Sequence, residues 1–344
     1  MNIVYVSSAD SGEITALRLD EASGTLVPVQ SIAVGDQAMP LAVSPDRRFL
    51  YAALRSQPYT VVSLRIGPGD GRLEEIGRSA LPDSMAYLAT DGSGHWLFGA
   101  SYGGDQISVS PIGAGGVAGA MAQVIPTGRH AHAVLVAPSN RHVLVTNLGA
   151  DQVMQLTFDP GTGWVSPNTP MTFAARAGAG PRHFVLHPEG RYVYLLNELD
   201  ASVEVLAFDG AKGILGASLQ TVSALPPRFD GKPWAADLHL TPGGELLVVS
   251  ERTSSTLLTF RIDAATGRLT LLTHVPTERQ PRSFAIDPSG RWLVAVGQLS
   301  HAATLYELDA ASGELTQRDR CAVGRNPGWV EIVPSDPRGC NTVA

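Results

Sequence analysis

The chain of 344 residues has little cysteine, little charge and no long apolar run. Its two cysteines, Cys321 and Cys340, are too few for a disulfide framework, so free thiols are expected. Charged residues make up 17% and the formal net charge is −7, which argues against a nucleic-acid partner. No apolar stretch approaches the roughly 20 residues of a membrane span, and the N-terminus lacks a signal-peptide pattern. We therefore expect a soluble cytoplasmic protein that binds neither nucleic acid nor membrane.

Helical periodicity and several common catalytic loops are also missing. The glycine-rich segment GAGG lacks the strand-to-helix context of a nucleotide-binding loop. The nucleophile motif GxSxG is absent, which argues against an acyl-enzyme route. Turn residues, in contrast, are abundant, because 36 glycines and 24 prolines are scattered along the chain. This distribution indicates many turns and few long helices, and therefore an all-β fold.

One strand–turn–strand unit recurs along the chain. Typical copies are LAVSPDRRFLYAAL, FVLHPEGRYVYLLNE and FAIDPSGRWLVAVG, in which two β-rich runs flank a tight turn. The copies align on the first residue of the turn, at Pro45, Asp91, Pro138, Pro188, Pro242, Pro288 and Pro334. Successive positions are 46 to 54 residues apart. A period of this length, with several strands in each repeat, is typical of a β-propeller.

Four strands in each of seven repeats predict a seven-bladed β-propeller with four antiparallel strands per blade. A third strand follows in segments such as QVMQLTFD, and a DxxxG turn introduces the fourth. The last repeat contains only its first strand, and residues 3–34 supply the other three, which closes the ring and removes exposed sheet edges. We expect one domain over residues 1–334 and a polar tail over 335–344. A solenoid or a two-sheet sandwich accounts less well for the regular period and the split final repeat.

Propeller geometry predicts where polar side chains converge. The innermost strand pairs antiparallel with the second strand, so the start of one lies beside the end of the other on one rim. Residues at these two positions of every blade are expected to ring one pocket. This ring includes Arg55, Tyr87, Tyr102, His130, His132, Asn147, Arg182, His183, Asn197, Glu198, Trp234, Asp237, His239, Glu251, Arg252, Arg282, Gln298, His301, Asn326 and Trp329. The opposite rim receives turns such as SPDRR and HPEGR, and turn chemistry alone explains their residues, including His187.

Some members of the ring have a structural interpretation beside a functional one. Asp237 and His239 are candidates for hydrogen bonds that join neighbouring blades, and His183 could cap or pack beside its strand. Both interpretations remain open from the sequence.

The arginines favour a binding site more strongly. Arg182 with Glu198 could be a local ion pair between two strand ends. Arg252 and Arg282, however, occupy matching places in the next two blades. Three arginines around one carboxylate exceed what a single ion pair requires, so we interpret them as part of a site for an anion.

Several segments together resemble a known family. HAHAVLVAPSN, GAGPRHFVLHPEGRYVYLLNELDASVEV, PWAADLHLTPGG, SERTSSTL and QPRSFAIDPSGRWLVAVGQLSH are similar to the seven-bladed 6-phosphogluconolactonases of the bacterial pentose phosphate route. The similarity runs from residue 1 to about residue 333, and the motifs are specific in combination and weak singly. The same superfamily resembles the fungal carboxymuconate lactonising enzymes.

The resemblance implies hydrolysis of 6-phospho-D-glucono-1,5-lactone to 6-phospho-D-gluconate, without a metal or other cofactor. It implies that the site contains His132, Arg182, Glu198, Arg252 and Arg282, and alignment on the APSN turn favours His132 over His130. It does not settle how these residues divide the work.

Lactone hydrolysis needs an activated water, a stabilised oxyanion and a grip on the substrate. Arginine suits the substrate phosphate, and we expect two of Arg182, Arg252 and Arg282 to hold it while the third faces the carbonyl oxygen. His132 is the favoured base, because arginines should lower the pKa of Glu198 and make it a poorer one. We therefore expect a catalytic group of His132, Glu198 and Arg182. The expected substrate-binding residues are Arg252, Arg282, His183, Asn197, Asp237, His239 and Gln298.

We expect no metal, because the arginines would repel one, and no other cofactor. The expected partner is a small anionic sugar-phosphate lactone, and the chain is expected to be a monomer or a weak homo-oligomer. Two alternatives remain open: a muconate-type cycloisomerase or lactonase acting on a di- or tricarboxylate, and a non-enzymatic propeller scaffold. The WD dipeptide of many scaffold propellers is absent, which counts against the scaffold.

Overall fold

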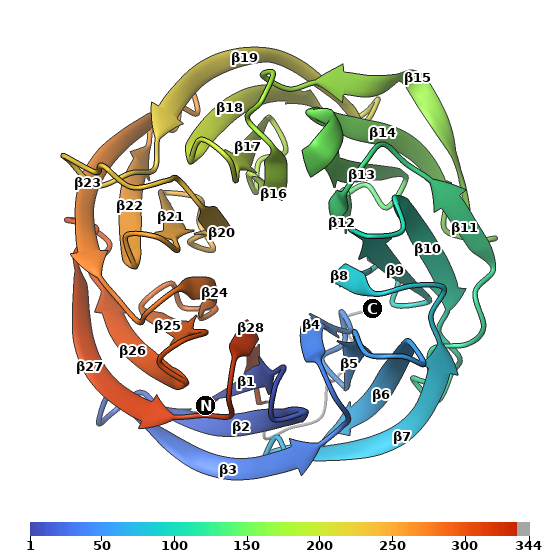
Figure 1. Cartoon of the computed structure of the whole chain (residues 1–344), viewed down its shortest axis with the longest axis horizontal. Helices are drawn as coiled ribbons and strands as arrows, with labels where there is room; N and C mark the ends of the chain where they lie inside the picture. The colour runs from blue at the N-terminus through green and yellow to red at the C-terminus, as the bar shows by residue number, and fades with distance from the viewer. Residues whose placement is uncertain (336–344) are drawn as a thin grey trace.

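Short runs of β-branched and aromatic residues, separated by turns rich in glycine and proline, give the chain an all-β fold. The computed structural model describes residues 1–335. Within them it contains 28 β-strands in seven four-stranded antiparallel sheets, and one 3-10 helix, η1 (Leu148–Ala150). The sheets stand as blades around a central axis, and the first strand of each blade is innermost (Figure 1). The predicted seven-bladed β-propeller is confirmed.

Six blades are built from consecutive strands of the chain, which follow one another from the axis outward. Blade one contains β4 (Ala38–Val43), β5 (Phe49–Leu54), β6 (Thr60–Ile66) and β7 (Leu73–Ala80). Blade two contains β8 (Met85–Thr90), β9 (Trp96–Ser101), β10 (Gln106–Pro111) and β11 (Gln123–Pro126). Blade three contains β12 (Ala131–Val136), β13 (His142–Asn147), β14 (Gln152–Asp159) and β15 (Trp164–Ala174).

The other three follow the same order. Blade four contains β16 (Pro181–Leu186), β17 (Tyr192–Asn197), β18 (Ser202–Asp209) and β19 (Ile214–Ser223). Blade five contains β20 (Ala235–Leu240), β21 (Leu246–Glu251), β22 (Thr256–Ile262) and β23 (Leu269–Pro276). Blade six contains β24 (Pro281–Ile286), β25 (Trp292–Gly297), β26 (Ala302–Leu308) and β27 (Leu315–Ala322).

The seventh blade joins the two ends of the chain. It contains β28 (Pro327–Pro334), β1 (Asn2–Ser8), β2 (Glu13–Asp20) and β3 (Thr25–Ala33). Strand β1 pairs antiparallel with β28, and the carbonyl oxygen of Met1 accepts hydrogen bonds from the amide and hydroxyl of Ser335. The predicted closure of the ring is therefore confirmed. Apart from Ser335, the predicted tail 335–344, with Cys340, lies outside the described residues.

The hydrophobic core fills the spaces between neighbouring blades. Every residue of β1, β5 and β13 is buried, whereas the outermost strand β7 has one buried residue, Leu73, and its other residues are partly or fully exposed. One cluster between blades four and five contains Tyr194, Leu247 and Phe260, and another between blades seven and one contains Tyr5 and Leu50. This packing fixes the inner strands, and the inner strands carry the polar ring.

The turns between first and second strands correct one detail of the sequence alignment. The amide of Asp91 donates to the carbonyl oxygen of Trp96 at 3.0 Å, just as the amide of Asp287 donates to that of Trp292 at 2.8 Å. Asp91 therefore corresponds to Asp287, the residue before Pro288, and not to the proline itself. The reason is shared turn chemistry, because both aspartate side chains accept hydrogen bonds from the serine two residues later.

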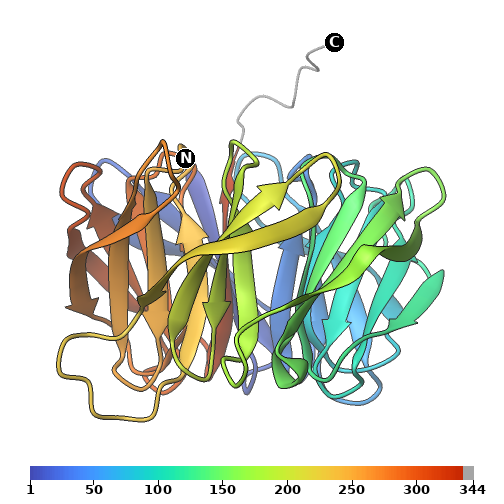
Figure 2. The same cartoon turned by 90° about the horizontal axis from the view of Figure 1, so that it is seen from above.

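The two faces of the propeller differ in what they carry. The loop that precedes β20, drawn in yellow, projects from one face, and the N-terminus lies at the other (Figure 2). The inner strands begin on the face of this loop. None of the described residues forms a helix long and apolar enough to cross a membrane.

Candidate active site

Several of the innermost strands have a β-bulge near their start, where one extra residue has no partner on the second strand. In blade four this extra residue is Arg182, between Pro181 and His183. Arg282 has the same place in blade six, and His132 has it in blade three. Such bulges commonly re-aim a side chain beside a functional site. In this propeller they bring one histidine and two arginines to equivalent positions around the axis.

The residue that follows the second strand supplies the other half of the ring. The backbone amides of Glu198, Arg252 and Gln298 each donate to the carbonyl oxygen of the residue just before the innermost strand of the same blade, at 2.8 to 3.1 Å. Arg55 makes the same bond in blade one, to Gln37. The antiparallel hairpins therefore place these side chains on the same rim, as predicted. We call these residues, together with His132, Arg182 and Arg282, the inner ring.

Glu198 is the centre of a buried ion-pair triad. Its Oε2 accepts from Arg182 Nε at 2.8 Å and lies 2.8 Å from Arg252 Nη2. The side chains of Arg182, Glu198 and Arg252 are 1%, 14% and 2% exposed. Burial raises the pKa of Glu198, but Arg182 and Arg252 outweigh it and leave the pKa below its ordinary value. The carboxylate is therefore ionised at neutral pH, which makes it a weak base.

Both arginines of this triad are also tied to backbone. Arg252 donates through Nε to the carbonyl oxygen of Trp234 at 3.1 Å and through Nη2 to that of Ala235 at 2.9 Å, and it lies 3.9 Å over the Trp234 ring. Arg182 donates through Nη1 to the carbonyl of Ala236. Burial, followed by the charge of Arg182, lowers the pKa of Arg252 to about 9. These contacts hold Arg182 and Arg252 in one orientation around Glu198.

Arg282 differs from the other two predicted arginines. Among residues 1–335 its guanidinium forms no ion pair, although it is enclosed by the ring. Burial, followed by the positive charges of Arg182, Arg252 and Arg55, lowers the pKa of Arg282 well below its ordinary value. Arg282 is partly exposed, so an anion from solvent can reach its guanidinium group.

His132 lies in an aromatic setting beside the arginines. Its ring meets Tyr102 edge-on at 6.0 Å and His183 at 5.1 Å, and only 4% of the residue is exposed. Its Nδ1 is buried and has no hydrogen-bond partner within residues 1–335. Burial, then Arg182 and His183, lowers the pKa of His132 well below its ordinary value. The imidazole is therefore neutral at pH 7.

Asp237 links two histidines one layer further along the axis. Its Oδ1 accepts from His183 Nδ1 at 2.8 Å, and its Oδ2 lies 3.3 Å from His239 Nε2. Because His183 belongs to blade four and Asp237 to blade five, this contact joins neighbouring blades, in keeping with the structural interpretation of Asp237. Burial, then Arg182, lowers the pKa of His183 to about 4 although Asp237 opposes the shift. Burial lowers the pKa of His239 less than Asp237 raises it.

Other predicted residues lie in different settings. Asn197 is fully buried in blade four, where its amide donates to Ser202 and Glu204, which argues against contact with a substrate. Gln298 stays on the rim and donates to Asn326 at 2.8 Å. His130 stacks on Tyr102 at 4.2 Å and lies before its strand, so His132 is the histidine within the inner ring.

Glu331 is an acid of this region that the sequence analysis missed. Trp329 Nε1 donates to its Oε1 at 2.8 Å, and it lies near His239 and Asp237. Burial raises the pKa of Glu331 to about 7. The available signal was the period of two along β28, which places Glu331 on the same side of the strand as Trp329.

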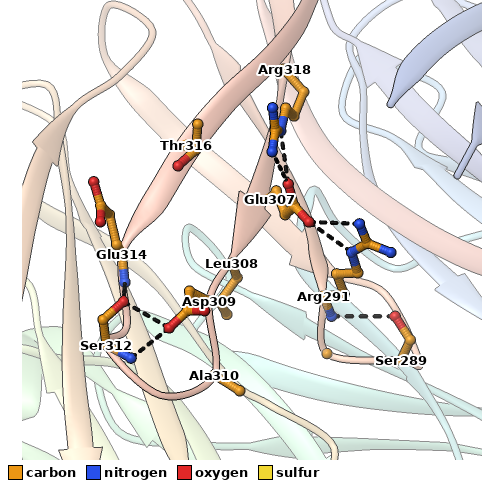
Figure 3. A pocket seen from close by; sticks show the side chains of 11 residues that line it. Ser289, Arg291, Glu307, Leu308, Asp309, Ala310, Ser312, Glu314, Thr316 and Arg318 are labelled. Carbon is orange, nitrogen blue, oxygen red and sulfur yellow. Dashed lines mark hydrogen bonds and ion pairs between the residues drawn. The ribbon is translucent and has the colours of Figure 1, made fainter. Parts of the chain in front are cut away.

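A large cavity lies elsewhere, on the outer part of blade six (Figure 3). Its volume is about 660 Å³. Its central carboxylate is paired with two arginines: Glu307 binds Arg291 at 2.7 Å on one oxygen and Arg318 on the other (Figure 3). Asp309 accepts from the amide and hydroxyl of Ser312 in a turn. Turn chemistry and exposed ion pairs account for most of the polar side chains of this cavity.

Within residues 1–335, no three His, Cys, Asp or Glu side chains are arranged so that they could hold a metal ion. Metal independence stays a prediction. Cys321 is a free, partly buried thiol remote from the inner ring in sequence and blade position.

Known proteins share both the fold and the length of this chain. The family described as "Lactonase, 7-bladed beta-propeller" matches residues 3–332, and the chain belongs to this family. It is 40% identical over 335 residues to the 6-phosphogluconolactonase of Pectobacterium carotovorum, with 97% of this chain and 99% of that protein covered. The 6-phosphogluconolactonase of Serratia proteamaculans is 40% identical over 333 residues, with 96% and 98% covered.

A solved structure with a different name has nearly the same fold as this chain. The periplasmic gluconolactonase of Pseudomonas aeruginosa has a TM-score of 0.90 and 28% identity, and the match covers 97% of this chain and 99% of that one. The relatives therefore include lactonases named for a phosphorylated and for an unphosphorylated sugar lactone.

Proposed function

We propose that this protein hydrolyses 6-phospho-D-glucono-1,5-lactone to 6-phospho-D-gluconate, a reaction of the oxidative pentose phosphate pathway. The names of the curated relatives support this proposal. The observation that carries it is the surplus of positive charge at the inner ring, where the guanidinium groups of Arg182, Arg252, Arg282 and Arg55 outnumber the carboxylates of Glu198 and the neighbouring Asp237. A phosphorylated lactone brings a charge of about −1.5 to −2, which this surplus of guanidinium groups would balance.

The proposed reaction is attack of water on the lactone carbonyl. His132 takes the proton from water in this scheme, because its imidazole is neutral at pH 7 and lies beside the arginines of the inner ring. The carbonyl carbon then becomes tetrahedral, and its oxygen gains negative charge. Collapse of this intermediate breaks the ring ester bond, and the alkoxide of the leaving hydroxyl takes the proton back from His132. The carboxylic acid that forms loses its own proton to water at neutral pH. The products are therefore the carboxylate and the free hydroxyl of the open-chain acid, with one proton released to solvent.

Arg182 is the proposed partner of the oxyanion. Its Nε and Nη1 are held by Glu198 and by the carbonyl of Ala236, so its remaining nitrogen is fixed in place before the reaction. A fixed donor aimed at developing charge typically contributes roughly 10²–10³ in rate. Glu198, whose pKa is lowered, acts in this scheme by orienting Arg182 and Arg252, and it is a positioning residue.

The proposed mechanism uses no metal and no cofactor. We expect activity to survive exhaustive treatment with EDTA. A loss of activity that calcium restores would contradict this part of the proposal.

Unphosphorylated gluconolactone is a second candidate substrate, because a structural relative is named a gluconolactonase. The test is an assay with freshly generated 6-phosphogluconolactone beside gluconolactone and a muconolactone, each compared with its uncatalysed rate. We expect the phosphorylated substrate to have the highest kcat/KM. No acceleration of its hydrolysis would overturn the proposed function, and preference for the muconolactone would favour the cycloisomerase alternative.

A further inference from the structure

The four arginines of the inner ring fall into two pairs with different partners. Arg182 and Arg252 are almost fully buried, share Glu198 and donate to backbone carbonyls. Arg282 and Arg55 form no ion pair among residues 1–335. Arg55 donates through Nε to the hydroxyl of Ser84 at 3.0 Å, and its Nη1 lies 3.8 Å from the Met39 sulfur, the side chain's one other hydrogen-bond contact among residues 1–335. The second pair therefore has N–H groups that can donate to a ligand.

Arg55 and Arg282 lie on the same side of the ring. Gly328 is the extra residue of β28 in blade seven, the blade that separates the blades of these arginines. A Cβ on Gly328 would lie 2.9 Å from the sulfur of Met39, which Arg55 contacts, and 3.7 Å from Cδ of Arg282. Glycine at this place thus removes the side chain that would stand between the two arginines.

Carboxylates among residues 1–335 do not neutralise the positive charges of Arg55 and Arg282. Burial lowers the pKa of Arg55, and the charge of Arg55 is itself one of the causes that lower the pKa of Arg282. The two guanidinium groups are partly exposed and repel each other, and among residues 1–335 no carboxylate binds either of them. An anion bound between them would relieve this repulsion. Guanidinium groups donate in a planar fork that fits phosphate oxygens.

We propose that Arg55 and Arg282 form the phosphate subsite and that Arg55 is a specificity-determining residue of the reaction. This inference rests on the proposed function. It divides the inner ring into a reacting side on blades three to five, with His132, Arg182 and Glu198, and an anion-binding side on blades six, seven and one. Arg252 then serves to hold Glu198, and the phosphate is held by one arginine from the predicted trio and one from outside it.

The catalytic test compares two substrates in each variant. Arg55→Gln and Arg282→Gln are expected to lower kcat/KM for 6-phosphogluconolactone about 10- to 100-fold more than for gluconolactone, because a charge-assisted hydrogen bond to phosphate is lost. Arg55→Lys keeps the charge and is expected to recover part of the preference. Arg65→Gln is the matched control, since Arg65 is an exposed arginine of blade one that binds Glu74, and it should leave the kcat/KM of both substrates unchanged. Melting temperatures show whether each variant is folded.

A binding test separates this inference from the proposed function. In calorimetric titration the wild type is expected to bind 6-phosphogluconate more tightly than gluconate, and Arg55→Gln to lose most of that difference. If the wild type hydrolyses the phosphorylated lactone but the variants lower both substrates equally, the inference is wrong and the function stands. If the wild type does not accelerate hydrolysis, the proposed function fails, and the two affinities still decide whether Arg55 binds phosphate.

Discussion

Two glutamates of this propeller each bind two arginines, and their surroundings are opposite. Glu198 binds Arg182 and Arg252 at the inner ring, where the three side chains are 1 to 14% exposed. Glu307 binds Arg291 and Arg318 on the outer part of blade six, where the arginines are 57% and 48% exposed (Figure 3). The chemistry is the same, and only the position in the blade differs.

The difference shows which charges of the fold point to function. An exposed ion pair stabilises little, because water and salt screen it and its side chains lose freedom. Burying a charge is costly even when it is paired, so a buried triad is a weak source of stability by itself. A large cavity beside Glu307 therefore marks no reactive site, while the crowded ring around Glu198 does. Desolvated charge is the better guide to function in this molecule.

The largest expected effect is on catalysis and comes from the histidine of the inner ring. His132→Ala should lower kcat for the phosphorylated lactone about 10²–10⁴-fold, because the proposed base is removed. His187→Ala is the matched control, since His187 is also buried but contacts the backbone of Gly244 in a turn at the other rim. Steady-state rates of the two folded variants decide the question, and equal losses would contradict the assignment.

The second effect is on stability. Arg182→Ala should lower the free energy of unfolding by about 3–5 kcal/mol, because it leaves Glu198 buried with one partner instead of two. Arg318→Ala removes an exposed partner of Glu307 and should leave the melting temperature nearly unchanged. Denaturant titration measures both. A small loss in Arg182→Ala would mean that the inner triad is as well solvated as the outer one.

The third and smallest effect is a pH dependence from Glu331. Burial raises its pKa to about 7 in the folded protein, whereas an unfolded glutamate titrates near 4.3. Between these values the folded state holds the extra proton, so this group stabilises at low pH and loses its contribution as pH rises through 7. His239, Asp237 and Trp329 are the neighbours that share this environment. Glu331→Gln should therefore melt higher relative to wild type at pH 8 than at pH 5, and a constant difference would contradict the assignment.

The sequence predicted the architecture and the pairing of the ring for physical reasons that are local. Turn residues at a regular period define the blades, and antiparallel hairpins place Arg182 beside Glu198 whatever the side-chain details. The bulge at Arg182 was not visible, because it shifts the register without any distinctive residue. The burial of Asn197 was not visible either, because it depends on partners that β18 brings alongside, such as Glu204.

Partners from distant segments were beyond the sequence as well. The bonds from Arg252 to the backbone of Trp234 and Ala235 depend on rotamers fixed by packing. The gap at Gly328 depends on the closure of the ring, which brings the last strand between blades six and one. These two features separate the arginines that hold Glu198 from those that can hold a phosphate.

The most direct test of the comparison is to remove the same charge from both triads. Glu198→Gln and Glu307→Gln are each measured for kcat/KM with freshly generated 6-phosphogluconolactone. We expect a loss of about 10- to 100-fold in Glu198→Gln, since the arginines lose the charge-assisted contacts that orient them, and no change in Glu307→Gln. Full activity in Glu198→Gln, or equal losses in both variants, would contradict the assignment of the active site to the inner ring.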